Sequence, residues 1–164
     1  MALHPQLDEL LDRVLPTVKH FHSKSMLAPH AATIDHVGAL TGRALTTDGS
    51  NQLTVSQAIS HFESSFSELA KAGEIHASGI FYHGAGVDTS SGTVELPPAS
   101  TVEECVALVG LLEHVSGESI YILIPYQSGP SSIEYSVGKL IEKPPRVFLQ
   151  KATQRTAKPW WRFW

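Results

Sequence analysis

Apolar residues recur at spacings of three and four near the start of the chain, a pattern that predicts an amphipathic helix from His4 to about Lys24. Pro5 suits the first turn of that helix, because the N–H that proline lacks has no helical partner there. Pro16 lies in the interior, where proline removes a hydrogen bond and clashes with the preceding turn, so we expect a kink or a break near it. The predicted apolar face consists of Leu7, Leu10, Leu11, Val14, Leu15, Val18 and Phe21.

A second helix is predicted after Thr54. Thr54 and Gln57 have the spacing of a capping box, in which each side chain accepts a hydrogen bond from the backbone N–H of the other residue. Gly73 follows the last apolar position, where a left-handed C-cap is expected. The predicted buried stripe consists of Val55, Ala58, Ile59, Phe62, Phe66 and Leu69.

Short strands are predicted between these helices and directly after the second one. Alternating positions and glycine punctuation place two strands at roughly 30–37 and 42–47, and residues 48–51 are typical of a turn. Residues 74–87 predict a strand that ends in a glycine-rich turn. The segment 88–101 is polar and contains Gly and Pro, which predicts a long loop.

The second half of the chain contains one ambiguous element. Residues 104–115 fit either a helix or a buried strand, and periodicity does not separate the two. The turn-like residues 115–119 and the apolar segment 119–126 favour a hairpin that pairs 104–115 with 119–126. Residues 133–142 fit a short helix or a strand, and residues 146–150 fit a last strand.

The resulting order, α-β-β-α-β-β-β, predicts an α+β fold. Two main helices are expected to pack on a mainly antiparallel sheet of about five strands, both of them on one face. Residues 1–150 are expected to form a single domain, followed by a basic and aromatic C-terminal tail at residues 151–164.

Two resemblances accompany this prediction. The element order is similar to that of profilin-like and roadblock-like α+β domains, and the resemblance implies a fold that mostly serves interaction modules. The segments IYILIPYQ (120–127) and IEYSVGKL (133–140) resemble small bacterial α+β proteins of unassigned function. These segments contain no catalytic residue, so the resemblance bears on the fold and on a bacterial origin rather than on an activity.

The composition is that of a globular domain, with 42% apolar and 17% charged residues in a chain of 164. The single cysteine, Cys105, cannot form an intramolecular disulfide, which indicates a reducing compartment. The N-terminal residues lack the pattern of a signal peptide, and no apolar run approaches the roughly 20 residues that span a bilayer. We therefore expect a soluble, cytoplasmic protein.

The net charge of −4 is unevenly distributed. Residues 146–164 carry five basic side chains and no acid, which leaves −9 on the remainder. An acidic body argues against nucleic acid as a partner, and so short a tail argues against a membrane.

The C-terminal tail holds all three tryptophans of the chain within its last five residues. Trp and Arg are enriched at binding hot spots, so the tail predicts a contact surface. It either folds back on its own domain or contacts another molecule, which is then a protein partner or a second copy in a homo-oligomer. The predicted partner-binding residues are Lys158, Trp160, Trp161, Arg162, Phe163 and Trp164.

Nine histidines raise the question of a metal site, because imidazole is a common ligand for transition metals. No HExxH or CxxC motif is present, so such a site has to be assembled from several elements. The alternative function is therefore a small metal-dependent enzyme or ligand binder with a pocket near residues 84–101. Its candidate residues are His36, His83, His114 and Glu113, with Tyr126.

Catalytic motifs are otherwise lacking in the sequence. No G-x-S-x-G, P-loop or G-x-G-x-x-G pattern is present, and Cys105 lies beside two acids that oppose thiolate formation. No catalytic residue and no cofactor is predicted. The leading hypothesis is a non-enzymatic protein-binding or scaffolding module whose contact surface combines the tail with the 88–101 loop.

Overall fold

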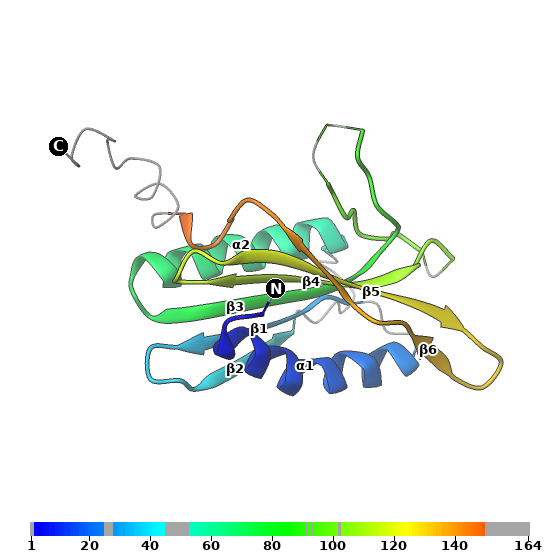
Figure 1. Ribbon diagram of the computed structural model, residues 1–164, viewed down its shortest axis with the longest axis horizontal. Helices are drawn as coiled ribbons and strands as arrows, with labels where there is room; N and C mark the ends of the chain where they lie inside the picture. Colours follow the sequence, from blue (N-terminus) through cyan, green and yellow to red (C-terminus); the bar gives the residue numbers. More distant parts are fainter. Residues whose placement is uncertain are drawn as a thin grey trace.

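The computed structural model describes residues 2–24, 28–44, 53–90, 92, 94–101 and 103–149 (Figure 1). Helix α1 spans Pro5–Ser23 and helix α2 spans Val55–Lys71. The strands are β1 (His30–Asp35), β2 (Leu40–Ala44), β3 (Ile75–Gly84), β4 (Ala107–His114), β5 (Ser119–Ser128), β6 (Ile133–Tyr135) and β7 (Lys139–Glu142). The predicted α+β class is confirmed, with more strands than the five expected.

The sheet is antiparallel at every pairing. Its order is β2-β1-β3-β4-β5-β6, and β7 also pairs with β5. Strands β3 and β4 lie at the centre, and the residues that join them, 85–106, form a long connection that we call the β3–β4 loop. Figure 1 shows this loop projecting from one end of the sheet, well beyond the strands.

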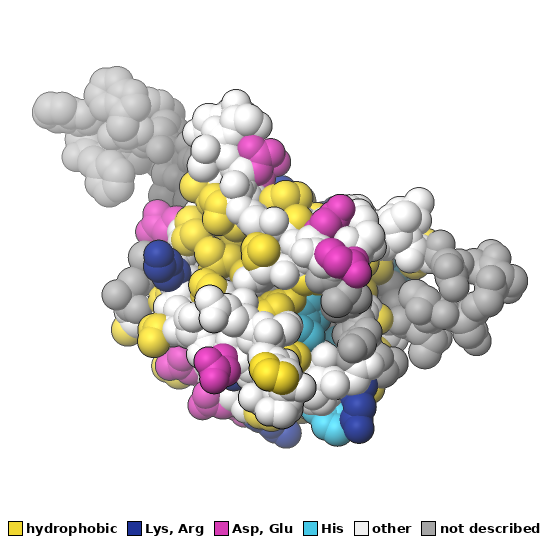
Figure 2. All heavy atoms as spheres, turned by 90° about the vertical axis from the view of Figure 1, so that its right-hand side faces the viewer, with side chains coloured by type: hydrophobic (Ala, Val, Ile, Leu, Met, Phe, Trp, Pro, Cys, Tyr) yellow, Lys and Arg dark blue, Asp and Glu magenta, His cyan; other side chains and the backbone are white. Residues whose placement is uncertain are grey.

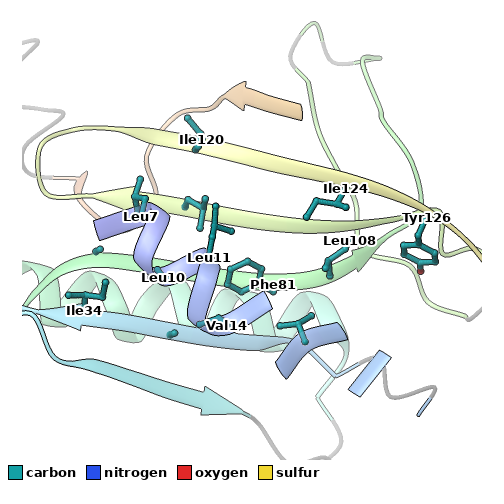
Figure 3. Packing of buried hydrophobic residues seen from close by; sticks show 14 residues of the cluster. Leu7, Leu10, Leu11, Val14, Ile34, Phe81, Leu108, Ile120, Ile124 and Tyr126 are labelled. Carbon is teal, nitrogen blue, oxygen red and sulfur yellow. The ribbon is translucent and has the colours of Figure 1, made fainter. Parts of the chain in front are cut away.

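The two helices cover opposite faces of the sheet, which corrects the expectation that both lie on one face. Helix α1 packs against one side of β3 and β4, where Phe81 and Leu108 are buried (Figure 3). Helix α2 packs against the other side, where Ile80 and Val109 are buried. Successive strand residues point to opposite faces, and β4 is buried along its whole length, so both faces need a cover.

Helix α1 continues through Pro16, where a kink or a break was expected. The residues on both sides of the proline bury apolar side chains in the same layer, with Leu10 before it and Val18 after it. Burial of such side chains on the sheet offsets the hydrogen bond that proline removes. The break is therefore absent, because tertiary packing outweighs the local preference.

Helix α2 begins and ends as predicted. The side chain of Thr54 accepts a hydrogen bond from the N–H of Gln57, and the side chain of Gln57 accepts one from the N–H of Thr54. Gly73 follows the helix with a φ of 72°, a left-handed conformation that favours glycine.

The later segments follow the sequence prediction with one exception. The ambiguous segment 104–115 contains β4, and it forms the predicted hairpin with β5. The residues 133–142 form the two short strands β6 and β7. Residues 146–149 do not form the expected strand, because the backbone N–H groups of Arg146, Val147 and Phe148 all point to one carboxylate, that of Glu113.

Gly110 lies opposite Phe81 in the β3–β4 register, and the aromatic ring covers it. A Cβ at Gly110 would lie 2.7 Å from Cγ2 of Ile122 and 2.9 Å from Cε1 of Phe81. We therefore expect Gly110→Ala to lower the free energy of unfolding by roughly 2 kcal/mol, because the core has to shift to accept the methyl group. Denaturant unfolding measures this loss, and Gly42→Ala, at an exposed strand position with open space, serves as the control. Equal stability of the two variants contradicts the expectation.

Candidate binding pocket and histidine cluster

The β3–β4 loop leaves the sheet as a narrow antiparallel pair of segments. The backbone N–H of Ala85 donates to the carbonyl of Pro97, and Asp88 and Glu95 exchange two backbone hydrogen bonds of 2.7 Å. Tyr82, on the adjoining strand, donates its hydroxyl to the carbonyl of Leu96. These bonds hold residues 95–98 against the edge of the α2 layer.

A pocket of about 260 Å³ lies between this part of the loop, helix α2 and the sheet. Its walls combine two tyrosine rings, two prolines and aliphatic side chains, with a few polar groups converging among them. Such a combination is typical of binding pockets. The lining residues are Ser56, Ile59, Ser60, Glu63, Tyr82, Glu95, Leu96, Pro97, Pro98, Leu111, Tyr121 and Arg146.

Two carboxylates and one guanidinium give the pocket its electrostatic character. Oε1 of Glu63 lies 3.6 Å from Nη1 of Arg146. Burial raises the pKa of the Glu63 carboxyl above its usual range, although Arg146 opposes the shift. Burial also raises the pKa of Tyr121, so its hydroxyl stays protonated at neutral pH. The pocket therefore offers acidic acceptors beside aromatic surfaces.

Glu113 positions the segment that brings Arg146 to the pocket. Its carboxylate is buried on the α2 face of β4, and Oε2 accepts a 2.9 Å hydrogen bond from Nζ of Lys143. Oε1 accepts from the N–H groups of Arg146 and Val147, both at 2.9 Å, and of Phe148 at 3.3 Å. Burial lowers the pKa of Lys143 while the Glu113 carboxylate opposes that shift. Glu113 is thus a structural anchor for residues 143–148.

A second group of polar side chains lies on the opposite, α1 face of the sheet. Nδ1 of His22 and the hydroxyl of Tyr135 are 2.7 Å apart, and Nδ1 of His83 and the hydroxyl of Tyr126 are 3.3 Å apart. The two imidazole rings approach to 4.4 Å between centroids. Burial lowers the pKa of His83 to about 4, with His22 and His30 adding to the shift, so His83 is neutral at pH 7.

This histidine cluster (His22, His83, Tyr126 and Tyr135) lies at the end of the core that α1 covers, where Figure 3 shows Tyr126 at one extremity. Figure 2 looks onto one end of the molecule and shows a histidine side chain at the bottom of a hollow. Neutral imidazole and protonated tyrosine form hydrogen bonds here without a buried charge, which is how a polar group is accommodated in a core.

The structure separates most residues of the predicted histidine site. His83 pairs with Leu108 in the sheet, whereas His114 pairs with Ala77 at the other end of β4, about 20 Å away at 3.4 Å per residue. His36 is exposed in the turn after β1. Of the residues considered, only Tyr126 contacts His83.

The remaining two candidates also have structural partners. His114 stacks on His4 at 3.5 Å between ring centroids, and its Nε2 lies 2.8 Å from the side-chain oxygen of Gln6. Glu113 faces the α2 layer and therefore lies on the other side of the sheet from His83. Within the described ranges, no three His, Cys, Asp or Glu side chains are grouped so that they hold a metal ion.

The other predicted functional residues lie elsewhere. The tail residues Lys158 and Trp160–Trp164 fall outside the described part of the chain. Cys105 is half-buried, its Sγ donates to the carbonyl of Thr101, and burial raises the pKa of its thiol, which disfavours the thiolate.

Sequence reasoning did not find the pocket residues. Glu63, Tyr82, Glu95, Tyr121 and Arg146 come from five separate segments, and only the fold brings them together. No spacing along the chain marks such a set. The predicted long loop was the one signal that pointed toward this region.

Compared with known protein families, curated proteins and solved structures, the chain matches none. Neither of the two helices in the described residues is both long and apolar enough to cross a membrane.

Proposed function

We propose that the protein is a non-enzymatic binding module for another protein, and that its contact surface combines the 88–101 loop with the C-terminal residues 158–164. The observation that carries this proposal is the pocket beneath the loop, which has aromatic and proline walls and an acidic rim. A pocket of this kind accepts a large anchor side chain, the usual source of affinity in protein interfaces.

Exposed valines of the longer β3–β4 loop, which contains residues 88–101, extend this surface. Val87 is 55% exposed, Val106 is 48% exposed and Val94 is 37% exposed. Figure 2 shows apolar side chains gathered over part of one end of the molecule, with acidic side chains beside them. Apolar contact area surrounded by charge is the arrangement that binding surfaces use, since the charges orient the partner and the apolar groups supply affinity.

The histidine and carboxylate groups that an enzymatic function would use have other roles in the described residues. Glu113 binds a lysine and three backbone N–H groups, and His83 forms a buried hydrogen bond with Tyr126. A small-ligand binder is the second candidate, and the volume of the pocket favours it over the metal-dependent version.

The double variant Val87→Asp with Val94→Asp is expected to lower recovery of the partner protein about fivefold or more, because each substitution places a charge where apolar contact supplies affinity. Tagged full-length protein is used to capture partners from native lysate, and recovery is quantified for wild type and the double variant. Val37→Asp is the matched control, because Val37 is exposed in the turn after β1, and Asp35 at the end of β1 pairs with Ile75, at the end of β3 opposite the loop.

A protein that is recovered with wild type and with Val37→Asp, and lost with the double variant, supports the proposal. Captured proteins that bind all three chains equally contradict it, because the loop then contributes nothing to recognition. A small molecule retained in the pocket, with no protein dependent on the loop, favours the second candidate instead.

A further inference from the structure

We propose that the chain's own C-terminal segment, residues 151–164, docks in the pocket between α2 and residues 95–98, with one tryptophan in the pocket and basic side chains against Glu63 and Glu95. The inference deepens the proposed function and rests on it for one point only, that this pocket belongs to the contact surface. The docked segment completes that surface, since two tryptophans are left over to contact a partner.

The chemistry of the pocket fits an indole ring. The rings of Tyr82 and Tyr121 and the prolines Pro97 and Pro98 provide flat apolar walls, and the volume of about 260 Å³ is large enough for one large aromatic side chain. A buried indole N–H needs an acceptor, and the carboxylate of Glu63 lies in the lining. The tail supplies tryptophans at three of its last five positions.

Charge is complementary between the pocket and the segment. The lining contains two carboxylates, Glu63 and Glu95, and one basic side chain, Arg146. Residues 151–164 carry four basic side chains and no acid. A basic residue next to the inserted tryptophan therefore meets unlike charge at the rim, and the partly buried position of Glu63 reduces screening by salt.

The length of the chain places the segment within reach of the pocket on the same molecule. Arg146, itself part of the lining, is held in place by Glu113, and the described chain ends three residues later at Leu149. Ten residues separate Leu149 from Trp160, enough to span roughly 18 Å as a flexible chain. Such a tether gives an effective concentration on the order of millimolar, which favours docking within one chain over docking on a second copy.

Intrinsic fluorescence of the full-length protein tests the inference, because all three tryptophans lie in this segment and no other tryptophan contributes. We expect the native protein to show blue-shifted emission and partial protection from acrylamide, relative to the same chain unfolded in guanidinium. Glu95→Lys is expected to lower the docking equilibrium constant about fivefold, because it replaces an attraction at the rim with a repulsion.

Two further variants make the result specific to the pocket. Ser60→Arg, at an exposed position of α2 that lines the pocket, adds bulk and like charge and is also expected to remove the protection. Glu134→Lys makes the same charge change as Glu95→Lys at an exposed position on β6 and is expected to leave the fluorescence unchanged. Circular dichroism checks that each variant is folded.

Four results overturn the inference. Native tryptophans as accessible as in the unfolded chain show that the segment does not dock. An equal effect of Glu134→Lys and Glu95→Lys shows that the segment is attracted to the whole acidic body rather than to the pocket. Tryptophan protection that is unchanged in both Glu95→Lys and Ser60→Arg, with both variants folded, also shows that the segment does not occupy the pocket. Protection that increases with protein concentration places the segment on a second copy. The proposed function is tested by a different measurement, the recovery of a partner protein that depends on the loop. Failure of the docking inference therefore leaves that test unaffected.

Discussion

Replacement of Glu113 by alanine is expected to lower the free energy of unfolding by about 3–5 kcal/mol, the largest effect we anticipate for a single side chain. The side chains of Glu113 and Lys143 are only 3% and 2% exposed. Removal of the carboxylate leaves a buried ammonium group without its counter-charge. It also leaves three backbone N–H groups, at residues 146–148, without their acceptor.

Urea unfolding of the full-length chain measures this loss. Glu74→Ala is the matched control, because it removes an exposed carboxylate close to the start of β3. The double variant Glu113→Leu with Lys143→Met removes both charges and is expected to recover part of the stability, although the three N–H groups stay unpaired. A loss for Glu113→Ala no larger than that for Glu74→Ala contradicts the assigned role.

Glu113 also illustrates what a sequence pattern does not contain. Its place in an apolar run was clear, and the strand around it was predicted. Its partners lie 30 to 35 positions later in the chain, and three of them fall in the segment 146–150 that was expected to be a strand. One carboxylate that collects three consecutive N–H groups has no periodic signature, so this anchor is found only once the strand and the later segment are packed together.

Local signals were the reliable part of the prediction. The capping box of Thr54 and Gln57 and the glycine after α2 depend on neighbours within a few residues, and both were found where expected. The hairpin of β4 and β5 followed from its turn residues. The boundaries of α2 and the β4–β5 hairpin were therefore predicted correctly where short-range chemistry decides.

Tertiary packing decided the features that were predicted incorrectly. The placement of the helices on opposite faces follows from apolar side chains on both sides of β3 and β4, an arrangement that periodicity alone does not distinguish from a single buried face. The continuity of α1 through Pro16 has the same origin. The pocket depends on these placements, because helix α2, the sheet and the β3–β4 loop form its separate walls.

The histidine cluster connects the packing of the α1 layer to pH. Acidification from about pH 7.5 to pH 5 is expected to destabilise the protein by about 2 kcal/mol through His83 alone. The pKa of His83 is lowered from 6.5 to about 4 in the folded protein. Between these two values the unfolded chain binds a proton that the folded protein does not, so stability is full above about pH 6.5 and is lost as the pH falls toward 4.

Neighbouring groups modify this dependence without reversing it. Burial also lowers the pKa of His22 and of His30, so both add to the loss on acidification. The pKa of Glu63 is raised, which acts in the opposite direction because the folded protein then binds a proton more readily than the unfolded chain. The effect of the buried His83 imidazole is therefore identified only by the part of the pH dependence of stability that disappears when His83 is replaced.

His83→Gln isolates that contribution. Glutamine retains a side chain that forms hydrogen bonds near Tyr126 but does not titrate, so the variant is expected to lose less stability than wild type between pH 7.5 and pH 5, by about 2 kcal/mol. Denaturant unfolding at several pH values measures the difference, and His61→Gln, which removes an exposed imidazole on α2, serves as the control. If His83→Gln and wild type lose stability in parallel, protonation of His83 does not control the acid sensitivity.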